Sequence, residues 1–205
     1  MCGELATLAA GCDDAPMSTR SARVAVPRPE ELREDAATVL PLIAPPGREP
    51  ARTMAILALQ PDLLQPFLGW AAALALNGVL PVREHEVLAL RTAWNCASEF
   101  EWAEHVEYAR DAGLDDDEIA DIARRVDSRS WSPRERVLLQ VADELHSGSD
   151  VSDETWTDAA ALFTVQSLVE ITFVVGQYTM LSMVANAAGI EAPPGLPPMP
   201  LKDAR

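Results

Sequence analysis

The sequence has little cysteine, few aromatic side chains and few positive charges, and each shortage excludes a class of protein. Only three of its 205 residues are cysteines, at positions 2, 12 and 96, and no two of them form a Cys-x-x-Cys pair. A disulfide scaffold and a four-thiolate zinc site are therefore excluded. A reducing cytoplasm is the compartment we expect for such a chain.

Positive charge is outnumbered two to one, with 16 Lys and Arg against 32 Asp and Glu, for a net charge of −16. Nucleic acids and anionic membranes attract clusters of Lys and Arg, so we expect neither as a partner. Aromatic residues make up only 5% of the chain, whereas 48% is hydrophobic and rich in Ala and Leu. This composition favours helix over sheet, and the length suits one core.

The two ends differ in composition from the rest. Residues 1–23 are small and polar, and we expect a flexible N-terminal tail. The stretch 8–12 (LAAGC) has the small residues of a lipoprotein cleavage site but lacks the charged and long apolar segments of a signal peptide. Residues 193–205 are rich in proline and predict an extended C-terminal tail. One domain over residues 24–192 remains between them.

Helix-starting and helix-ending residues divide this domain into helices, and no strand pattern is present. Ser98 with Glu101, and Asp115 with Glu118, have the spacing of a capping box, and Ser132-Pro133 is a third strong start. The predicted helices cover residues 30–40, 51–59, 62–76, 82–95 and 98–112, a short one about 119–122, one from 132, and 152–162 and 165–188. The fold we expect is an all-α, single-domain helical bundle.

The last predicted helix, 165–188, is apolar on nearly every side and is long enough to suggest a membrane span. Glu170, Gln177 and Asn186 inside it argue against that, because each is costly in hydrocarbon. We interpret it as a core or subunit-interface helix.

The residues able to carry out acid–base chemistry lie between positions 86 and 105. Ser98, Glu101 and His105 are spaced by three and four residues, so they share one helix face. Glu86 belongs to the preceding helix, and the short connection brings it back towards that face. Two carboxylates and one imidazole are thus expected around a small pocket.

Alkylhydroperoxidase D-like proteins have a glutamate followed, twelve residues later, by Cys-x-x-Cys-x-x-x-His. Glu86, Ser98, Glu101 and His105 stand at the matching offsets, so the glutamate and histidine are kept and both cysteines are replaced. The chain therefore resembles the carboxymuconolactone decarboxylase/alkylhydroperoxidase D superfamily, in the branch that lacks the cysteine pair. The resemblance covers about residues 55–190. It implies the helical bundle of this superfamily and a homo-oligomer, whether dimer, trimer or hexamer.

With this motif we assign His105, Glu86 and Glu101 as catalytic and Ser98 as substrate-binding. We add Arg91, whose planar guanidinium suits a carboxylate, and Tyr178, two turns after Glu170, as substrate-binding. A histidine that titrates near neutral pH and a buried glutamate are sufficient for proton transfer without a metal or cofactor. Ser98 and Glu101 have a simpler interpretation as helix caps, and His105 has one as an ordinary core histidine.

Four further side chains have a structural interpretation. We predict Cys96 to be a buried structural cysteine, and Glu84 and His85 to lie on the surface. Glu170, in an apolar helix, needs a hydrogen-bond donor, for which Arg83 and Arg91 are the candidates.

The function expected from these residues and the family is a cofactor-independent carbon–carbon lyase. It would decarboxylate or isomerise a small carboxylated lactone or a related metabolite. Two alternatives remain open: a thiol-redox protein that uses Cys96, and a non-catalytic ligand-binding module on the same scaffold.

Overall fold

The computed structural model describes residues 22–44, 49–124, 126–127, 131–192 and 194–200. Most of the predicted N-terminal tail therefore lies outside the described residues. Where the description begins, the backbone N–H groups of Arg23 and Val24 both donate to the carbonyl of Ala188, at 2.7 and 3.1 Å. In the predicted C-terminal tail, Met199 packs against the core.

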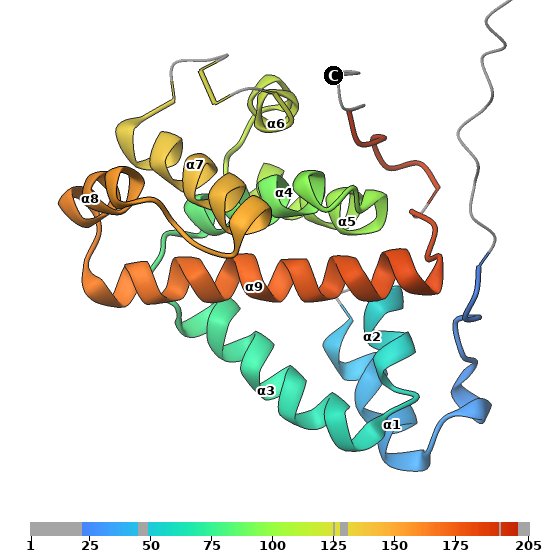
Figure 1. The fold of residues 1–205 in the computed structure, drawn as a ribbon. Coiled ribbons are helices and arrows are strands. Elements are labelled where there is room, and N and C mark those ends of the chain that lie inside the picture. The colour runs from blue at the N-terminus through green and yellow to red at the C-terminus, as the bar shows by residue number, and fades with distance from the viewer. Residues whose placement is uncertain (1–21, 45–48, 125, 128–130, 193, 201–205) are drawn as a thin grey trace, which may run out of the picture.

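The described part of the chain contains helices and no strand, which confirms the predicted all-α class. The elements are η1 (Pro29–Glu31), α1 (Glu34–Val39), η2 (Leu40–Ile43), α2 (Arg52–Leu57), α3 (Pro61–Asn77), α4 (Val82–Asn95), α5 (Glu99–Asp111), α6 (Asp116–Ile122), α7 (Pro133–Gly148), α8 (Asp153–Leu162) and α9 (Val165–Ala188). Figure 1 shows α9 running the width of the molecule, with α4, α5 and α7 on one side and α3, α2 and α1 on the other.

Capping residues account for most of the helix boundaries. Reciprocal capping boxes form at the starts of α6 and α7, between Asp115 and Glu118 and between Ser132 and Glu135. Gly113 and Gly189 follow α5 and α9 with positive φ angles of 86° and 70°, as expected of helix-ending glycines.

The predicted helix over residues 30–40 is wrong as a single element, because the structure breaks it into η1, α1 and η2. Glu31 accepts a hydrogen bond from the backbone N–H of Arg28 at 2.8 Å and closes a short 3₁₀ turn. The chain is then extended at Leu32, with ψ at 155°, before α1 begins.

Helix α4 forms the centre of the fold and packs against α5, α7 and α9. All of its residues from Glu84 to Ala93 are buried. One face of the helix enters the cluster that contains Leu88 and α9, and the other enters the cluster that contains Val87 and Trp102. From Glu84 onward, the side chains of the first turns of α4 are therefore inside the protein.

Helix α9 is long and apolar enough to cross a membrane by length and composition alone. Half of its most apolar window is buried inside the fold, and the core helix of a soluble protein passes the same test. Its buried residues include Leu168, Ile171, Val174 and Tyr178. These observations agree with its interpretation as a core helix.

Candidate active site

Glu86 and His105 form a buried pair between α4 and α5. The Nδ1 atom of His105 lies 2.7 Å from Oε2 of Glu86. A tight turn folds α5 back onto α4: Ala97 has a left-handed φ of 50°, and the N–H of Ser98 donates to the carbonyl of Ala93 at 2.9 Å. The predicted return of Glu86 towards the face of His105 is therefore present.

The surroundings of His105 favour its charged form. Burial alone would lower its pKa, but the negative charge of Glu86 and the hydrogen bond to it outweigh burial, with smaller contributions from Glu101 and Glu104, so the pKa is raised. Since Glu86 occupies Nδ1, Nε2 is the ring nitrogen that remains for a molecule in the adjoining cavity. The pair can therefore hold a transferable proton near neutral pH.

His85 and Tyr178 form a second pair beside the first. The Nε2 atom of His85 lies 2.9 Å from the hydroxyl oxygen of Tyr178. The Tyr178 ring also packs edge-on against the His105 ring, with 4.5 Å between ring centroids. One aromatic side chain from α9 thus contacts two histidines from different helices.

This second pair is neutral near pH 7. Burial lowers the pKa of His85, more than the charges of Glu86 and Glu170 raise it. Burial also raises the pKa of Tyr178 well above its usual value, and the nearby Glu86 and Glu101 add to that effect. Tyr178 therefore keeps its hydroxyl proton and can donate it to an oxygen atom in the cavity.

The prediction that Glu84 and His85 lie on the surface is wrong, because both are buried. Glu84 pairs with Arg134, whose Nε and Nη2 lie 2.6 and 2.8 Å from its two carboxylate oxygens. The unbroken apolar run 87–90 could have indicated this burial, because four successive apolar residues surround a helix on every side. His85 is a site residue that the sequence analysis placed wrongly, and Tyr108, which also lines the cavity, is one that it did not name.

A cavity of about 240 Å³ opens beside the two pairs. Its polar lining consists of His85, Glu86, His105, Tyr108 and Tyr178. Its apolar lining comes mainly from the end of α3 and the segment that follows, and includes Leu74, Leu76, Leu80 and Val82. The cavity is apolar on one side and carries acid–base groups on the other.

Glu101 and Ser98 lie deeper than the cavity and do not line it. The Oγ atom of Ser98 accepts the N–H of Glu101 at 3.5 Å, so Ser98 caps α5. The N–H of Ser98 is occupied by Ala93, and the Glu101 side chain does not complete the predicted capping box. Within the described residues, Oε1 of Glu101 has no hydrogen-bond partner. Burial raises the pKa of Glu101 to about 7, with His105 opposing and Glu104 adding to the shift.

Arg91, Cys96 and Glu170 differ from their predicted settings, and Arg91 does not line the cavity. Arg91 forms a bidentate pair with Asp143, at 2.7 and 2.6 Å, and donates to two backbone carbonyls. Cys96 is only partly buried, contrary to the prediction, and its Sγ lies 3.7 Å from Nδ1 of His146. Glu170 accepts the N–H groups of Val79 and Leu80 at 2.5 and 3.2 Å, so backbone rather than arginine satisfies it.

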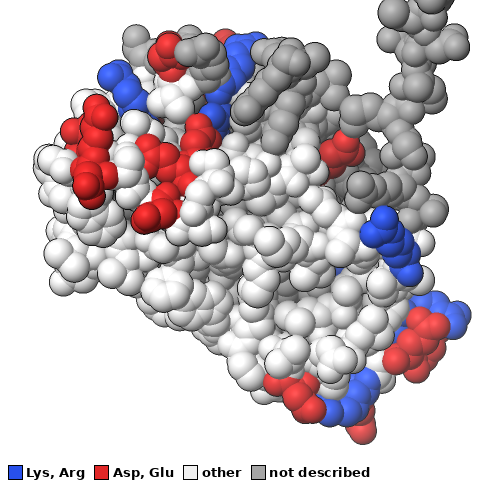
Figure 2. Space-filling view, viewed as in Figure 1, with Lys and Arg blue, Asp and Glu red and all other residues white. Residues whose placement is uncertain are grey.

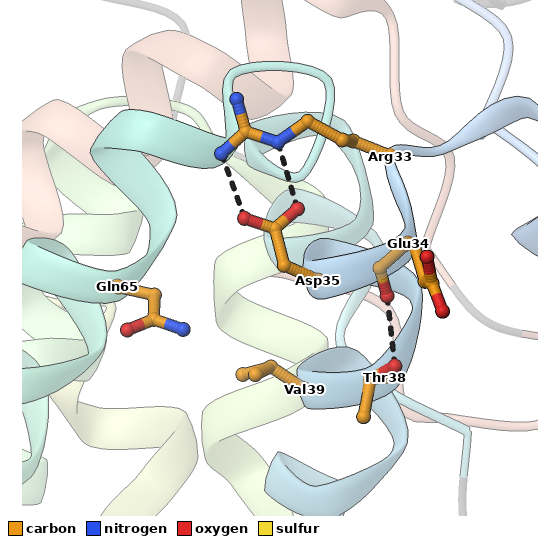
Figure 3. A pocket seen from close by; sticks show the side chains of 6 residues that line it. All are labelled: Arg33, Glu34, Asp35, Thr38, Val39 and Gln65. Carbon is orange, nitrogen blue, oxygen red and sulfur yellow. Dashed lines mark hydrogen bonds and ion pairs between the residues drawn. The ribbon is translucent and has the colours of Figure 1, made fainter.

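A second hollow lies on the surface between α1 and α3, lined by Arg33, Glu34, Asp35, Thr38, Val39 and Gln65. Figure 3 shows Arg33 paired with Asp35 and Gln65 facing them from α3. Arg33 also pairs with Asp62 at 2.8 Å, and all three charged side chains are largely exposed. The single cation of this hollow, Arg33, is engaged by two carboxylates, and none of the lining residues belongs to the Glu86–His105 site.

The described residues contain no group of three or more His, Cys, Asp or Glu side chains arranged to hold a metal ion. The acid–base groups are instead arranged as two side-chain pairs around a cavity.

Several solved structures share this fold. The alkylhydroperoxidase AhpD core protein of Ralstonia eutropha JMP134, an uncharacterized peroxidase-related protein, is 19% identical, with a TM-score of 0.75 over 84% of this chain and 93% of that one. A peroxidase-related protein of Silicibacter sp. TM1040 is 15% identical, with a TM-score of 0.72 over 87% and 92%. The debrominase Bmp8 is 14% identical, with a TM-score of 0.65 over 71% and 79%.

At the level of sequence, no curated protein matches the chain. Residues 61–144, which include α4, α5 and the Glu86–His105 pair, match the Carboxymuconolactone decarboxylase family. The matched segment supports the resemblance drawn from the motif: residues 61–144 are similar to the Carboxymuconolactone decarboxylase family, and the fold is that of alkylhydroperoxidase D-like proteins.

Proposed function

We propose that this protein is a cofactor-independent enzyme that transfers a proton to or from a small carbonyl compound, with His105 as the proton carrier. The substrate class is a small carboxylated lactone or a related ring, and the reaction is decarboxylation or isomerisation. The observation that carries the proposal is the buried His105–Glu86 pair at 2.7 Å, at the wall of a cavity that also contains the Tyr178 hydroxyl.

Tyr178 and His105 each have a role in the proposed decarboxylation. The bond between the ring carbon and the carboxylate breaks, carbon dioxide leaves, and the electron pair becomes an enolate. Tyr178 donates a hydrogen bond to the enolate oxygen, where negative charge develops. The His105 imidazolium then donates its Nε2 proton to the ring carbon and recovers a proton from solvent. In an isomerisation, neutral His105 first removes a proton and returns it at another carbon.

Glu86 and His85 support this chemistry without reacting. Glu86 fixes the orientation of the imidazole and stabilises its positive charge. His85 positions the Tyr178 hydroxyl through the contact of 2.9 Å between its Nε2 atom and the hydroxyl oxygen. Arg91 is engaged by Asp143, so among the described lining residues the His105 imidazolium is the cation available to a substrate carboxylate.

The size and walls of the cavity support a small cyclic substrate. A volume of about 240 Å³ lies just below the usual range for drug-sized ligands, which begins at about 300 Å³. A cysteine-to-alanine variant of Bmp8 is known in complex with 2,3,4-tribromopyrrole, so a protein of related fold holds one small ring. Cys96 is not among the cavity-lining residues, so the geometry favours proton transfer over thiol chemistry in this cavity.

Deuterium exchange tests the proposal whichever product the reaction forms. A panel of carboxylated γ-lactones is incubated with the protein in heavy water, and NMR measures the incorporation of deuterium and the loss of carbon dioxide. We expect His105→Ala to slow turnover by about a hundred- to ten-thousandfold, the usual contribution of a general acid or base.

His146→Ala is the matched control, because it removes an exposed histidine that lies outside the cavity. It should retain wild-type turnover, and so should Cys96→Ser. Full activity in a folded His105→Ala variant, shown by an unchanged circular dichroism spectrum, would overturn the proposal. Saturable binding of a lactone without exchange or turnover would also overturn it and would favour the ligand-binding module.

A further inference from the structure

The lining of the cavity beside the Glu86–His105 pair changes from buried to exposed along its length. Its buried part holds the acid–base groups His85, Glu86, His105 and Tyr178. The large side chains of its exposed part are Leu76 at the end of α3, Val82 at the start of α4 and Tyr108 on α5, which are 80%, 62% and 38% exposed. We call these three side chains the mouth of the cavity.

Helices α4 and α5 each place one residue of the mouth a single turn away from the catalytic pair. Val82 precedes Glu86 by four residues and Tyr108 follows His105 by three, so each lies on the same helix face as its partner in the pair. The tight turn at Ala97 makes the two helices antiparallel, so both steps lead in the same direction. The mouth therefore continues the cavity outward from the pair by about one helical turn, or about 5.4 Å.

The ring of Tyr108 joins the mouth to the catalytic pair. It packs against the His105 ring at a tilt of 56°, with 5.5 Å between the ring centroids. A molecule that contacts His105 from the cavity therefore passes Tyr108 on its way in. Scattered apolar side chains on a surface are ordinary, but these three border one cavity, which is the arrangement expected of a ligand site.

The mouth carries no charge. Among the described lining residues, Glu86 and protonated His105 are the charged ones, and both are at the buried end. No Lys or Arg belongs to this lining. Figure 2 shows that the surface over α3 and α9 is also uncharged, with the acidic and basic side chains gathered around it. A phosphate or carboxylate in the mouth would lose hydration without gaining a cation.

We propose, as a step that rests on the proposed function, that the ring of the substrate carries a linear alkyl substituent. The ring lies against the Glu86–His105 pair, and the chain lies in the mouth between Leu76, Val82 and Tyr108. One helical turn corresponds to about four or five bonds of an extended chain, so a chain of about five carbons fills the mouth. Its burial removes apolar surface of both the chain and the mouth from water, which favours binding.

Lactones that cannot lose carbon dioxide test this assignment apart from the reaction. The probes are saturated γ-lactones with a carboxyl group on the β carbon, where a breaking bond cannot pass its electron pair to the carbonyl oxygen. Their γ carbon carries a methyl, propyl or pentyl chain. In NMR titrations of the protein we expect the affinity to rise about two- to fourfold for each added methylene. A pentyl chain that ends in a carboxylate should bind at least about tenfold more weakly than the plain pentyl chain.

Substitutions in the mouth show where the chain lies. Leu76→Ala should lower the affinity for the pentyl lactone by about three- to tenfold and leave that for the methyl lactone unchanged. Leu42→Ala is the matched control, because it shortens a leucine that is 78% exposed and lies outside the cavity. Val82→Ala should have a smaller effect of the same kind. Its control is Val165→Ala, at another exposed valine that is the first residue of its helix.

Four results would each overturn the alkyl assignment. They are equal affinity for the three chain lengths, equal or tighter binding of the chain that ends in a carboxylate, equal weakening of the methyl and pentyl lactones by Leu76→Ala, and no binding of any probe. The proposed reaction fails separately, in the deuterium-exchange assay. Binding that depends on chain length, with no turnover of any lactone, would overturn the reaction and support the mouth. His105-dependent turnover without a preference for chain length would support the reaction and overturn the role of the mouth.

Discussion

At the scale of single residues, the most informative side chain is Glu101. It stands where relatives with the redox motif have their second cysteine. Its carboxylate is buried, Oε1 lacks a hydrogen-bond partner among the described residues, and its pKa is raised to about 7. Burial keeps this carboxyl group protonated in the acidic range up to about pH 7, one helical turn from His105.

The raised pKa of Glu101 predicts a loss of stability with rising pH. Below the ordinary glutamate value of 4.5 the group is protonated in both the folded and the unfolded chain. Between 4.5 and about 7 the unfolded chain releases the proton while the folded chain keeps it, so the free energy of unfolding falls. Glu101→Gln removes this effect. We expect equal stability of the two proteins near pH 4.5 and an advantage for the variant of up to about 3 kcal/mol at pH 8.5.

Thermal melts of both proteins across this pH range measure the difference, which should reach several degrees at high pH. Glu99→Gln, an exposed carboxylate in the same helix, controls for the loss of one negative charge. A difference in melting temperature between Glu101→Gln and the parent protein that is the same at all pH values would contradict the raised pKa of Glu101.

Residue spacing predicted the centre of the site but not all of its members. Glu86, His105 and Tyr178 line the cavity as expected, because helical periodicity and a short turn determine their faces. His85 was missed because its exposure depends on helices distant in sequence that cover α4. Arg91 was assigned to the substrate, although a nearby acidic residue of α7, Asp143, satisfies it. Pairings of this kind depend on tertiary packing and leave no local pattern.

At the scale of elements, the segment after α3 is fixed by one side chain of α9. Glu170 accepts the N–H groups of Val79 and Leu80, and these backbone groups lead into α4. Gly78 sits directly against this carboxylate, because a Cβ atom there would lie 2.2 Å from Oε1 of Glu170 and 2.7 Å from the carbonyl of Leu74. The apolar wall of the cavity therefore depends on a glycine that leaves room for a carboxylate.

Two substitutions test this contact. Glu170→Ala leaves two N–H groups without their acceptor and should cost about 1–3 kcal/mol in urea unfolding. Gly78→Ala should also destabilise, and less so when Glu170 is already Ala, although the Leu74 carbonyl keeps part of the clash. Gly69→Ala in α3 is the control, since a Cβ there meets nothing within 4 Å. It should stabilise by about 0.5–1 kcal/mol. Additive costs for Gly78→Ala and Glu170→Ala would refute the contact.

Helix boundaries were the most predictable part of the fold, because caps, prolines and glycines act locally. The starts at Ser98, Asp115 and Ser132 and the ends at Gly113 and Gly189 all agree with the sequence. The break at Leu32 was not predicted, because it depends on the turn that Glu31 closes with Arg28.

At the scale of the whole molecule, acidic charge dominates the surface and apolar packing dominates the interior. With a net charge of −16 the folded chain repels itself more strongly than the expanded chain does. Ion pairs such as Arg83 with Glu118 and Glu135 bridge helices but neutralise only part of this charge.

Screening of this repulsion by salt should therefore stabilise the folded protein. We expect the melting temperature at pH 8 to rise by a few degrees between about 10 mM and 150 mM sodium chloride, as the screening length falls from about 30 to 8 Å. Differential scanning calorimetry at one fixed protein concentration measures the change, and an uncharged osmolyte of equal osmolarity serves as the control. A melting temperature that falls with salt would mean that ion pairs outweigh the net repulsion.

The turn at Ala97 has a consequence for how sequences of this kind can diverge. One residue inserted here would change the path by which α5 returns to α4, and one inserted between the start of α5 and His105 would rotate His105 by about 100° away from Glu86. The length of the turn is therefore constrained even though Ala97 adopts a left-handed conformation that disfavours most residues. The side chains at 98 and 101 do not take part in the hydrogen bond between Glu86 and His105. The geometry of the Glu86–His105 pair therefore depends on the length of this turn and not on a thiol at either position.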